Sequence, residues 1–260
     1  MSVIDTLDMD FLAATAREAG AAILEVYNTD FNVDHKADHS PLTLADLRSN
    51  NIIAARLAEK YPGVPVLSEE STEQIPYEVR KGWPEFWLVD PLDGTKEFVK
   101  RNGQFTVNIA LVANGRPLAG VVYAPALGLL YYAREGQAAV KVEDGREPRA
   151  LSRSASLPAK RLVIAGSLSH PSPEMDAFVE EQRRKFEQVE FVSMGSSLKI
   201  CLVADGGADI YPRLGPTMEW DTAAAHAIAN ACGRRVLRWG SDQDLTYNKP
   251  DLHNDWFVVK

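Results

Sequence analysis

The chain has 260 residues, and its 28 basic and 36 acidic side chains give a formal net charge of −8 at pH 7. This length suits one large domain or two small ones. A composition with 45% hydrophobic and 25% charged residues excludes disordered, collagen-like and coiled-coil proteins. The acidic balance argues against a binder of nucleic-acid polymers. Because no basic, apolar leader and no apolar run of about 18 residues is found, we expect a cytoplasmic protein without an integral membrane segment.

The first half of the chain combines helices with strands. Apolar residues recur at helical spacing over residues 7–27 and 47–61, which predicts two long helices. Short apolar runs at 65–67 and 86–89 predict buried strands. Further β-rich runs, separated by turn residues, predict an antiparallel meander over residues 105–142.

Strands and helices alternate in the second half, which indicates a layered α/β unit. The predicted strands cover residues 162–165, 189–192, 208–211, 235–238 and 256–259, and the predicted helices cover 174–186, 196–204 and 221–231. A polar stretch at 144–160 is the candidate boundary between the halves. We therefore expect an N-terminal α+β subdomain over residues 1–155, which carries the metal-binding motifs, and a C-terminal α/β subdomain over residues 156–260.

The sharpest motif is Asp-Pro-Leu-Asp-Gly-Thr at residues 90–95, directly after an apolar strand. Pro91 has no backbone N–H to donate, so the strand is expected to end there, and the Leu92 carbonyl can turn outward as a hard oxygen ligand. Gly94 permits an unusual backbone conformation. If residues 96–100 are helical, the amides before them form an anion site beside two carboxylates. An ordinary Asp-Gly turn is the alternative at this point.

Further acidic residues lie at the ends of predicted elements. Glu69 and Glu70 follow a strand, and the segment that contains Glu219 and Asp221 opens a helix of small residues. Each could instead be a solvated loop residue or a helix cap. Two carboxylates about 4 Å apart repel by about 4 kcal/mol at an effective dielectric constant near 20, so a cluster of them requires cations. An all-oxygen donor set, without a His or Cys pattern, favours Mg²⁺ and argues against zinc.

The segment from Thr43 to Asp46 matches a capping box, which is its ordinary interpretation. The functional interpretation places Asp46 in a proton relay. The sequence contains no P-loop, no dinucleotide-binding glycine motif and no nucleophile elbow, so these rival chemistries have no support.

Three separated motifs, at residues 67–70, 87–95 and 220–224, resemble the signatures of the inositol monophosphatase superfamily. The resemblance implies a layered α/β (α+β) fold, the five-layer αβαβα sandwich of the inositol monophosphatase and sugar phosphatase type. It also implies a phosphomonoesterase that depends on two or more Mg²⁺ ions. Within the superfamily, residues 195–199 and 210–213 resemble those of the CysQ-type 3'(2'),5'-bisphosphate nucleotidases.

Lys199 and Arg213 separate this chain from inositol-type members, which tend to have an acidic residue near the second position. An acid would hydrogen-bond neutral inositol hydroxyls, whereas Lys and Arg pair with an additional phosphate. The resemblance therefore implies hydrolysis of the 3'-phosphate of adenosine 3',5'-bisphosphate, a by-product of sulfate activation, to AMP and phosphate. Either cation alone could instead be an exposed surface residue.

The resemblance also implies individual roles. The implied metal ligands are Glu69, Asp90, the carbonyl of Leu92, Asp93 and Asp221, with Asp90 bridging two ions. Thr95, hydrogen-bonded to Asp46, would orient the attacking water and relay its proton. The implied substrate-binding residues are Glu69, Leu92, Asp93, Gly94, Thr95, Ser167, His170, Gly195, Ser196, Lys199, Arg213 and Asp221. Ser169 would lie near the nucleotide, and Lys36 near the entrance.

Two alternatives remain open. The first is an inositol monophosphatase or fructose bisphosphatase of the same superfamily, in which Lys199→Ala would hardly alter activity. The second is an inactive nucleotide-binding regulator. The expected partner is a small nucleotide bisphosphate, bound by a monomer or a homodimer. The resemblance allows a peripheral association with the cytoplasmic face of a bacterial inner membrane, although no amphipathic basic helix supports it.

Overall fold

The computed structural model describes residues 2–29, 41–151, 160–166 and 173–260, and the side chains of 41 and 42 are not described. The helical elements are η1 Val3–Thr6, α1 Met9–Tyr27, α2 Pro41–Lys60, η2 Glu69–Gln74, α3 Tyr77–Arg80, α4 Thr95–Val99, η3 Pro125–Leu127, α5 Pro173–Arg183, α6 Leu198–Ala204 and α7 Ala223–Ala231. The strands are β1 Val66–Ser68, β2 Glu85–Asp93, β3 Thr106–Ala113, β4 Arg116–Ala124, β5 Leu129–Arg134, β6 Val140–Glu143, β7 Arg149–Ala150, β8 Arg161–Gly166, β9 Gln188–Ser193, β10 Tyr211–Arg213, β11 Val236–Arg238 and β12 Phe257–Val259.

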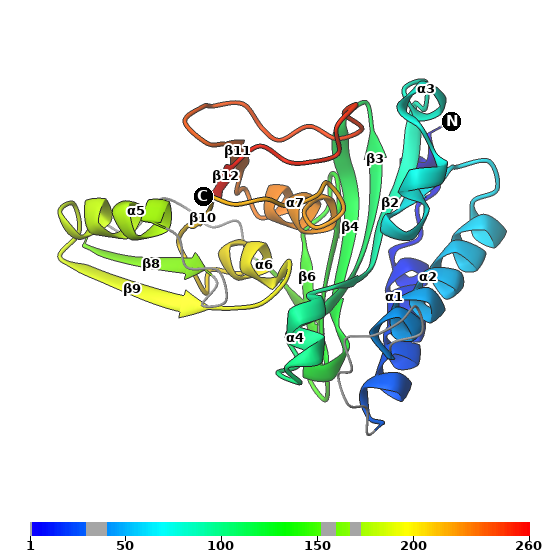
Figure 1. Cartoon of the computed structure of the whole chain (residues 1–260), viewed down its shortest axis with the longest axis horizontal. Coiled ribbons are helices and arrows are strands. Elements are labelled where there is room, and N and C mark those ends of the chain that lie inside the picture. Colours follow the sequence, from blue (N-terminus) through cyan, green and yellow to red (C-terminus); the bar gives the residue numbers. More distant parts are fainter. Residues whose placement is uncertain (1, 30–40, 152–159, 167–172) are drawn as a thin grey trace.

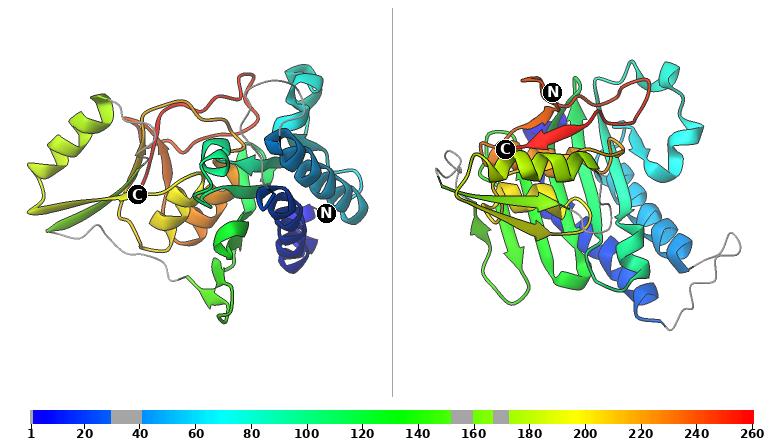
Figure 2. Two further views of the ribbon diagram at one scale, coloured as in Figure 1. Left: turned by 60° about the horizontal axis from the view of Figure 1, so that its bottom comes forward. Right: turned by 60° about the vertical axis from the view of Figure 1, so that its left-hand side comes forward.

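These elements stack in five layers (Figure 1). Helices α1 and α2 cover one face of a seven-stranded sheet of order β1-β2-β3-β4-β5-β6-β7, and α7, with α6 beside it, covers the other face. The ladders β8-β9 and β10-β12-β11 follow, linked by a bridge between Ile164 and Ile210. Helix α5 packs on β9 as the outermost layer (Figure 2). The predicted layered α/β fold, a five-layer αβαβα sandwich, is confirmed.

The large sheet is antiparallel except for the parallel pair β1-β2, which confirms the predicted meander. Helix α7 lies against β4 at Gly120, where a Cβ atom would stand only 2.1 Å from the carbonyl oxygen of Ala224. Only a residue without a side chain permits this approach. The close packing fixes the start of α7, and with it the preceding Asp221, over the middle of the sheet.

Strand β2 differs from the prediction, because it does not end at Asp90. Its pairing with β3 continues from Asp90 opposite Asn108 to Asp93 opposite Thr106, with a shift of register between them. Pro91 lies inside this irregularity, where the ladder requires no N–H from it. Both aspartates are therefore held by the sheet rather than by a free turn.

Three helix starts also differ from expectation. Helix α2 begins at Pro41, so Thr43 lies within its first turn and the capping-box interpretation is wrong. Helix α7 begins after Thr222, so Asp221 is not its cap. Helix α6 begins at Leu198, two residues later than predicted, because Ser196 adopts a left-handed backbone with φ of 46°.

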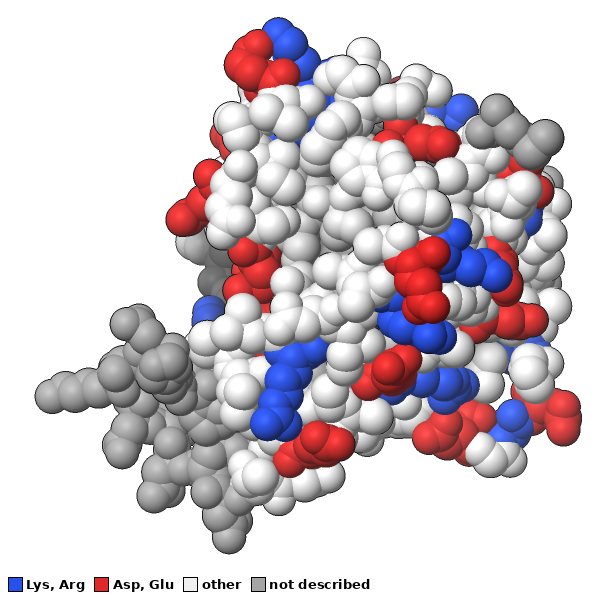
Figure 3. Space-filling model, turned by 90° about the vertical axis from the view of Figure 1, so that its right-hand side faces the viewer, with Lys and Arg blue, Asp and Glu red and all other residues white. Residues whose placement is uncertain are grey.

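Acidic and basic side chains intermingle on the face that carries α1 and α2 (Figure 3). Arg56 lies 3.5 Å from Glu18, and Arg48 lies 3.5 Å from Glu25. Among the described residues, no helix is both long enough and apolar enough to cross a membrane. The predicted boundary between residues 155 and 156 lies outside the described residues and stays a prediction.

Candidate active site

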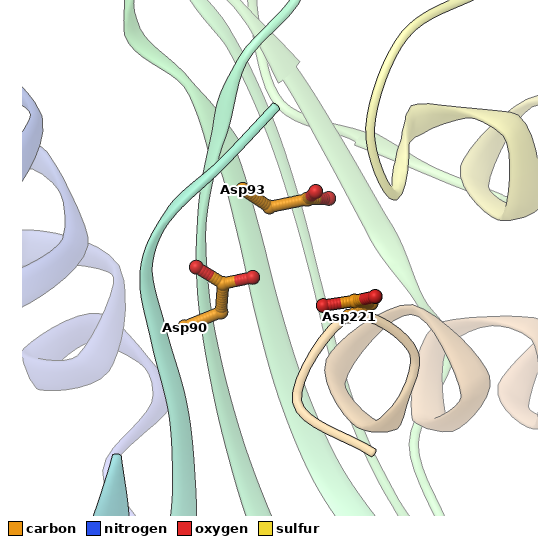
Figure 4. A group of neighbouring side chains, drawn as sticks. All are labelled: Asp90, Asp93 and Asp221. Carbon is orange, nitrogen blue, oxygen red and sulfur yellow. The ribbon is translucent and has the colours of Figure 1, made fainter. Parts of the chain in front are cut away.

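Three carboxylates from two separate segments converge at the carboxyl end of β2. Asp90 and Asp93 belong to β2, whereas Asp221 precedes α7, and the three side chains point toward one another (Figure 4). One oxygen of each lies within 4.8 Å of the others. A backbone amide fixes each of them: Leu92 donates to Asp90 Oδ1 at 3.0 Å, Met218 donates to Asp221 Oδ2 at 2.9 Å, and Ser197 donates to Asp93.

The electrostatics of this trio favour a bound cation. Burial raises the pKa of Asp90 well above its ordinary value, and the charges of Asp93 and Glu69 raise it further. Burial and the charge of Asp93 raise the pKa of Asp221 to about 7. Clustered carboxylates without compensating charge take up protons instead. Since every donor atom is a carboxylate oxygen, the trio fits a hard divalent ion such as Mg²⁺.

Asp93 also connects the acidic trio to the loop before α6. Its Oδ2 accepts a hydrogen bond of 2.7 Å from the Ser197 amide. The Ser197 hydroxyl lies 2.9 Å from that of Thr106 on β3. Burial raises the pKa of Asp93, while the Lys199 ammonium and the Ser197 amide oppose that rise. A change in this loop would therefore act directly on the trio.

Glu69 and Asp46 lie at the edge of the trio. Glu69 is the first residue of η2 and is exposed as a whole residue. Its pKa is nevertheless raised, first by the partial burial of its carboxyl group and then by the charges of Glu70 and Asp93. Burial, then the charges of Glu70 and Glu69, raise the pKa of Asp46 to about 8. Glu69 is therefore near the trio, although the three aspartates form the tight group without it.

The predicted hydrogen bond between Thr95 and Asp46 is not formed. Thr95 is exposed as the first residue of α4, and Asp46 Oδ1 is buried without a hydrogen-bond partner. Asp46 is instead buried and lies close enough to Glu70 and Glu69 for their charges to raise its pKa further. Gly94, with φ of 93°, sets the direction in which α4 leaves the strand and so directs Thr95 toward the cavity.

A cavity of about 210 Å³ opens beside the trio and brings together seven of the predicted site residues. They are Asp93, Gly94, Thr95, Ser196, Lys199, Arg213 and Asp221. Gly195 lies behind this wall, where its amide donates to Gln104 Oε1 at 2.7 Å. Glu69, Asp90, Leu92 and Asp46 do not line this cavity. The predicted residues Ser167, Ser169, His170 and Lys36 lie outside the described residues.

Two cations stand on the cavity wall. The Lys199 ammonium donates to the Ser196 carbonyl at 2.6 Å and lies 5.6 Å from the ring centre of Tyr211. Burial lowers the pKa of Lys199 to about 8, and the charge of Asp93 opposes this change. Arg213 donates to the Pro216 carbonyl at 2.8 Å. The cavity thus combines fixed carboxylates with fixed cations, as the binding of a metal ion together with an anionic ligand requires.

Eight further lining residues were not among the predicted site residues: Lys96, Glu97, Ser197, Ile200, Tyr211, Thr217, Thr222 and Phe257. Several of them lie within or beside the predicted motifs, so a wider window around those motifs would have included them. Thr217 and Phe257 have no such signal, because only the folded chain brings the β10 loop and β12 to the cavity.

The chain matches the inositol monophosphatase family over residues 7–256. It is 47% identical over 241 residues to the 3'(2'),5'-bisphosphate nucleotidase CysQ of Escherichia coli K12, covering 92% of this chain and 94% of that protein. The crystal structure of CysQ from Bacteroides thetaiotaomicron superimposes with a TM-score of 0.86 at 45% identity, covering 97% of both chains. An inositol monophosphatase from Staphylococcus aureus shares the fold, with a TM-score of 0.75 at 22% identity over 96% of this chain and 90% of its own.

The protein is therefore a member of the inositol monophosphatase family. Within that family, the Escherichia coli protein at 47% identity and the Bacteroides thetaiotaomicron structure at 45% identity are both CysQ proteins.

Proposed function

We infer that this chain is a 3'(2'),5'-bisphosphate nucleotidase that converts adenosine 3',5'-bisphosphate to AMP and phosphate. Relatives of that name share up to 47% of its sequence over more than nine-tenths of the chain. The structural observation that supports the inference is that Asp93, Asp221, Lys199 and Arg213 all line the same cavity. Carboxylates suit a metal that engages the reacting phosphate, and the cations suit a second phosphate.

The second phosphate gives the two cations their role. An inositol monophosphate presents neutral hydroxyl groups away from its reacting end, which Lys and Arg would not distinguish by charge. A nucleoside bisphosphate presents a dianion there, and a buried ammonium such as Lys199 binds an anion more strongly than an exposed one does. The same cations offset the repulsion that a net charge of −8 exerts on such a substrate.

We assign Mg²⁺ to the acidic trio Asp90, Asp93 and Asp221, with Glu69 and the Leu92 carbonyl as further ligands at the edge. When bound there, Mg²⁺ neutralises phosphoryl charge and lowers the pKa of bound water, in the way that two-ion phosphatase sites do. Asp46 Oδ1 has no hydrogen-bond partner, and the Glu69 carboxylate lies among other acidic groups. Both groups can therefore bind a cation or a water molecule.

The chain's own residues then orient the reaction. The Thr95 hydroxyl lies on the cavity wall, where it can hold the attacking water. Asp46 lies outside this wall with its Oδ1 unpartnered, and we assign it the proton that the water loses, which requires Asp46 and Thr95 to approach each other in the loaded site. The water oxygen bonds to phosphorus, the bond between phosphorus and the 3'-oxygen breaks, and the 3'-oxygen takes a proton from solvent, to which Asp46 returns the proton that it accepted, so that one water molecule is consumed overall. The amides of Gly94 and Thr95 would support the phosphate. This reaction would return the by-product of sulfate activation to the AMP pool.

Phosphate release tests this function when measured in parallel on adenosine 3',5'-bisphosphate, inositol 1-phosphate and fructose 1,6-bisphosphate, with Mg²⁺ and with EDTA. We expect a Mg²⁺-dependent preference for the nucleotide. Preference for inositol 1-phosphate would overturn the substrate assignment and retain the metal chemistry.

The role of Lys199 has its own control. We expect Lys199→Met to lower kcat/KM for adenosine 3',5'-bisphosphate by about 10- to 100-fold, and to affect adenosine 3'-monophosphate much less, because charge-assisted hydrogen bonds contribute about 1.5–3 kcal/mol. The matched control is Lys185→Met in the turn just after α5, whose side chain is 55% exposed. Equal losses on both nucleotides would show that Lys199 does not bind the second phosphate.

A further inference from the structure

Glu97 is a second kind of acid in the cavity, separate from the acidic trio. It belongs to α4, lines the cavity together with Lys199 and Thr95, and is only 8% exposed. Its methylene group packs beneath the loop before α6, since a Cβ atom on Gly195 would lie 2.7 Å from Glu97 Cγ. The side chain is thus held in position by packing rather than by hydrogen bonds.

The Glu97 carboxylate has no partner within the part of the chain that the structure describes. No hydrogen bond or ion pair to it is formed there, although the charge of Glu97 acts on both Lys199 and Asp93. Glu97 is more than nine-tenths buried as a residue, and its carboxylate can be reached only from the cavity, so leaving it unpaired there costs free energy in the free protein. A group that completes it on binding would recover that cost.

A phosphate cannot be that group, because two negative charges in a poorly hydrated cavity repel. Among the groups of the proposed nucleotide, the one that completes Glu97 must therefore be a hydrogen-bond donor. Adenosine 3',5'-bisphosphate has two neutral donors, the ribose 2'-hydroxyl and the exocyclic amine of adenine, since its 3'- and 5'-oxygens are esterified. Either donor lies in the nucleoside that joins the two phosphates.

We propose that Glu97 is a specificity-determining residue whose carboxylate accepts a hydrogen bond from a neutral O–H or N–H group of the nucleoside. This proposal rests on the proposed function and extends it from the phosphates to the nucleoside. Lys199 and Arg213 then recognise charge, while Glu97 recognises a neutral donor of the nucleoside.

The test is a cycle of two changes, one in the protein and one in the substrate. Glu97→Met and Glu97→Gln are assayed on adenosine 3',5'-bisphosphate, on its 2'-deoxy analogue and on the purine riboside 3',5'-bisphosphate, which lacks the amine. We expect Glu97→Met to lower kcat/KM for the parent nucleotide by about 10- to 100-fold, as the loss of a hydrogen bond to a charged group does. On the analogue that lacks the recognised donor, wild type and variant should be nearly equal, which identifies the donor.

Three controls keep the result interpretable. Glu174→Met, an exposed acid on α5, should behave as wild type on all three substrates. Thermal melting shows whether Glu97→Met is folded, and the nearly isosteric Glu97→Gln provides the comparison if it is not. Calorimetric binding of AMP and the two corresponding 5'-monophosphate analogues repeats the cycle without hydrolysis.

An equal loss on all three nucleotides would overturn the proposal, because Glu97 would then act through Lys199 or the fold. A variant as active as wild type on the parent nucleotide would overturn it too. Failure of the proposed function has a different signature, namely a wild-type protein that hydrolyses none of the three nucleotides, and in that case the binding cycle alone decides the role of Glu97.

Discussion

Two buried acidic regions lie next to each other in this molecule and are built in opposite ways. Glu219 is fully buried, yet its carboxylate accepts hydrogen bonds from the Asn248 amide at 2.6 Å, the Lys249 amide at 3.0 Å and the Lys249 ammonium at 2.6 Å. Two residues further along the chain, Asp221 faces two other aspartates. The first region contains its own compensation, whereas the second has carboxylates in excess of the cations around it.

This difference separates a structural acid from a functional one. Glu219 was a candidate because of its place beside Asp221 in the sequence, but its hydrogen bonds join the segment before α7 to the loop at residues 248–249. It supports Asp221 by fixing that segment. The acidic trio stabilises nothing by itself, because its members repel one another. Substitutions in the two regions should therefore have opposite effects on stability.

The largest expected effect on stability is at Lys249. We expect Lys249→Met to lower the free energy of unfolding by about 3 kcal/mol, the lower end of the cost of breaking a buried ion pair, because two backbone amides still compensate Glu219. Urea unfolding measures it. Lys185→Met, in an exposed ion pair, should change the same quantity by less than about 1 kcal/mol. If Lys249→Met also changed the free energy of unfolding by less than about 1 kcal/mol, that result would contradict the structural role of Glu219.

The next effect is on activity rather than stability. We expect Asp93→Asn to lower kcat/KM by at least about 100-fold, or about 2.7 kcal/mol, because even the outer partners of metal ligands contribute 10- to 100-fold. Asparagine retains an oxygen for the Ser197 amide and removes one repelling charge. The melting temperature in EDTA should therefore equal or exceed that of wild type. A marked drop, absent from the exposed control Asp176→Asn, would show that Asp93 is structural.

The sequence indicated this contrast only in part. The motif at residues 90–95 is contiguous, so its acids could be assigned to one site before the fold was known, and hydrophobic periodicity was enough to predict the helices and the meander. The backbone of Ser196, the register shift after Asp90 and the partners of Glu219 depend on contacts between distant segments. Glu97 was not predicted for the same reason. An isolated glutamate in a short helix resembles any solvated residue, and only the packing of Gly195 against it in the folded chain distinguishes it.

The smallest expected effect sharpens the comparison through pH. In the metal-free protein the pKa of Asp46 is raised to about 8 and that of Asp221 to about 7, from about 3.8 in the unfolded chain. Between about pH 4 and 8 the folded state therefore holds more protons than the unfolded state, and stability falls as pH rises through this interval. Buried His226, whose pKa is lowered to about 4, has the opposite effect, but that effect is complete near pH 6.5.

Urea unfolding in EDTA should accordingly show a loss on the order of 2 kcal/mol between pH 6.5 and 8. Saturating Mg²⁺ should reduce the loss, because an ion that binds the ionised trio favours the folded state as Asp221 deprotonates. Asp221→Asn should reduce it, whereas Glu219→Gln should leave it in place, since the Lys249 ammonium opposes the effect of burial on the pKa of Glu219. A pH profile that is flat in EDTA would mean that the acidic trio is already compensated within the fold, as Glu219 is.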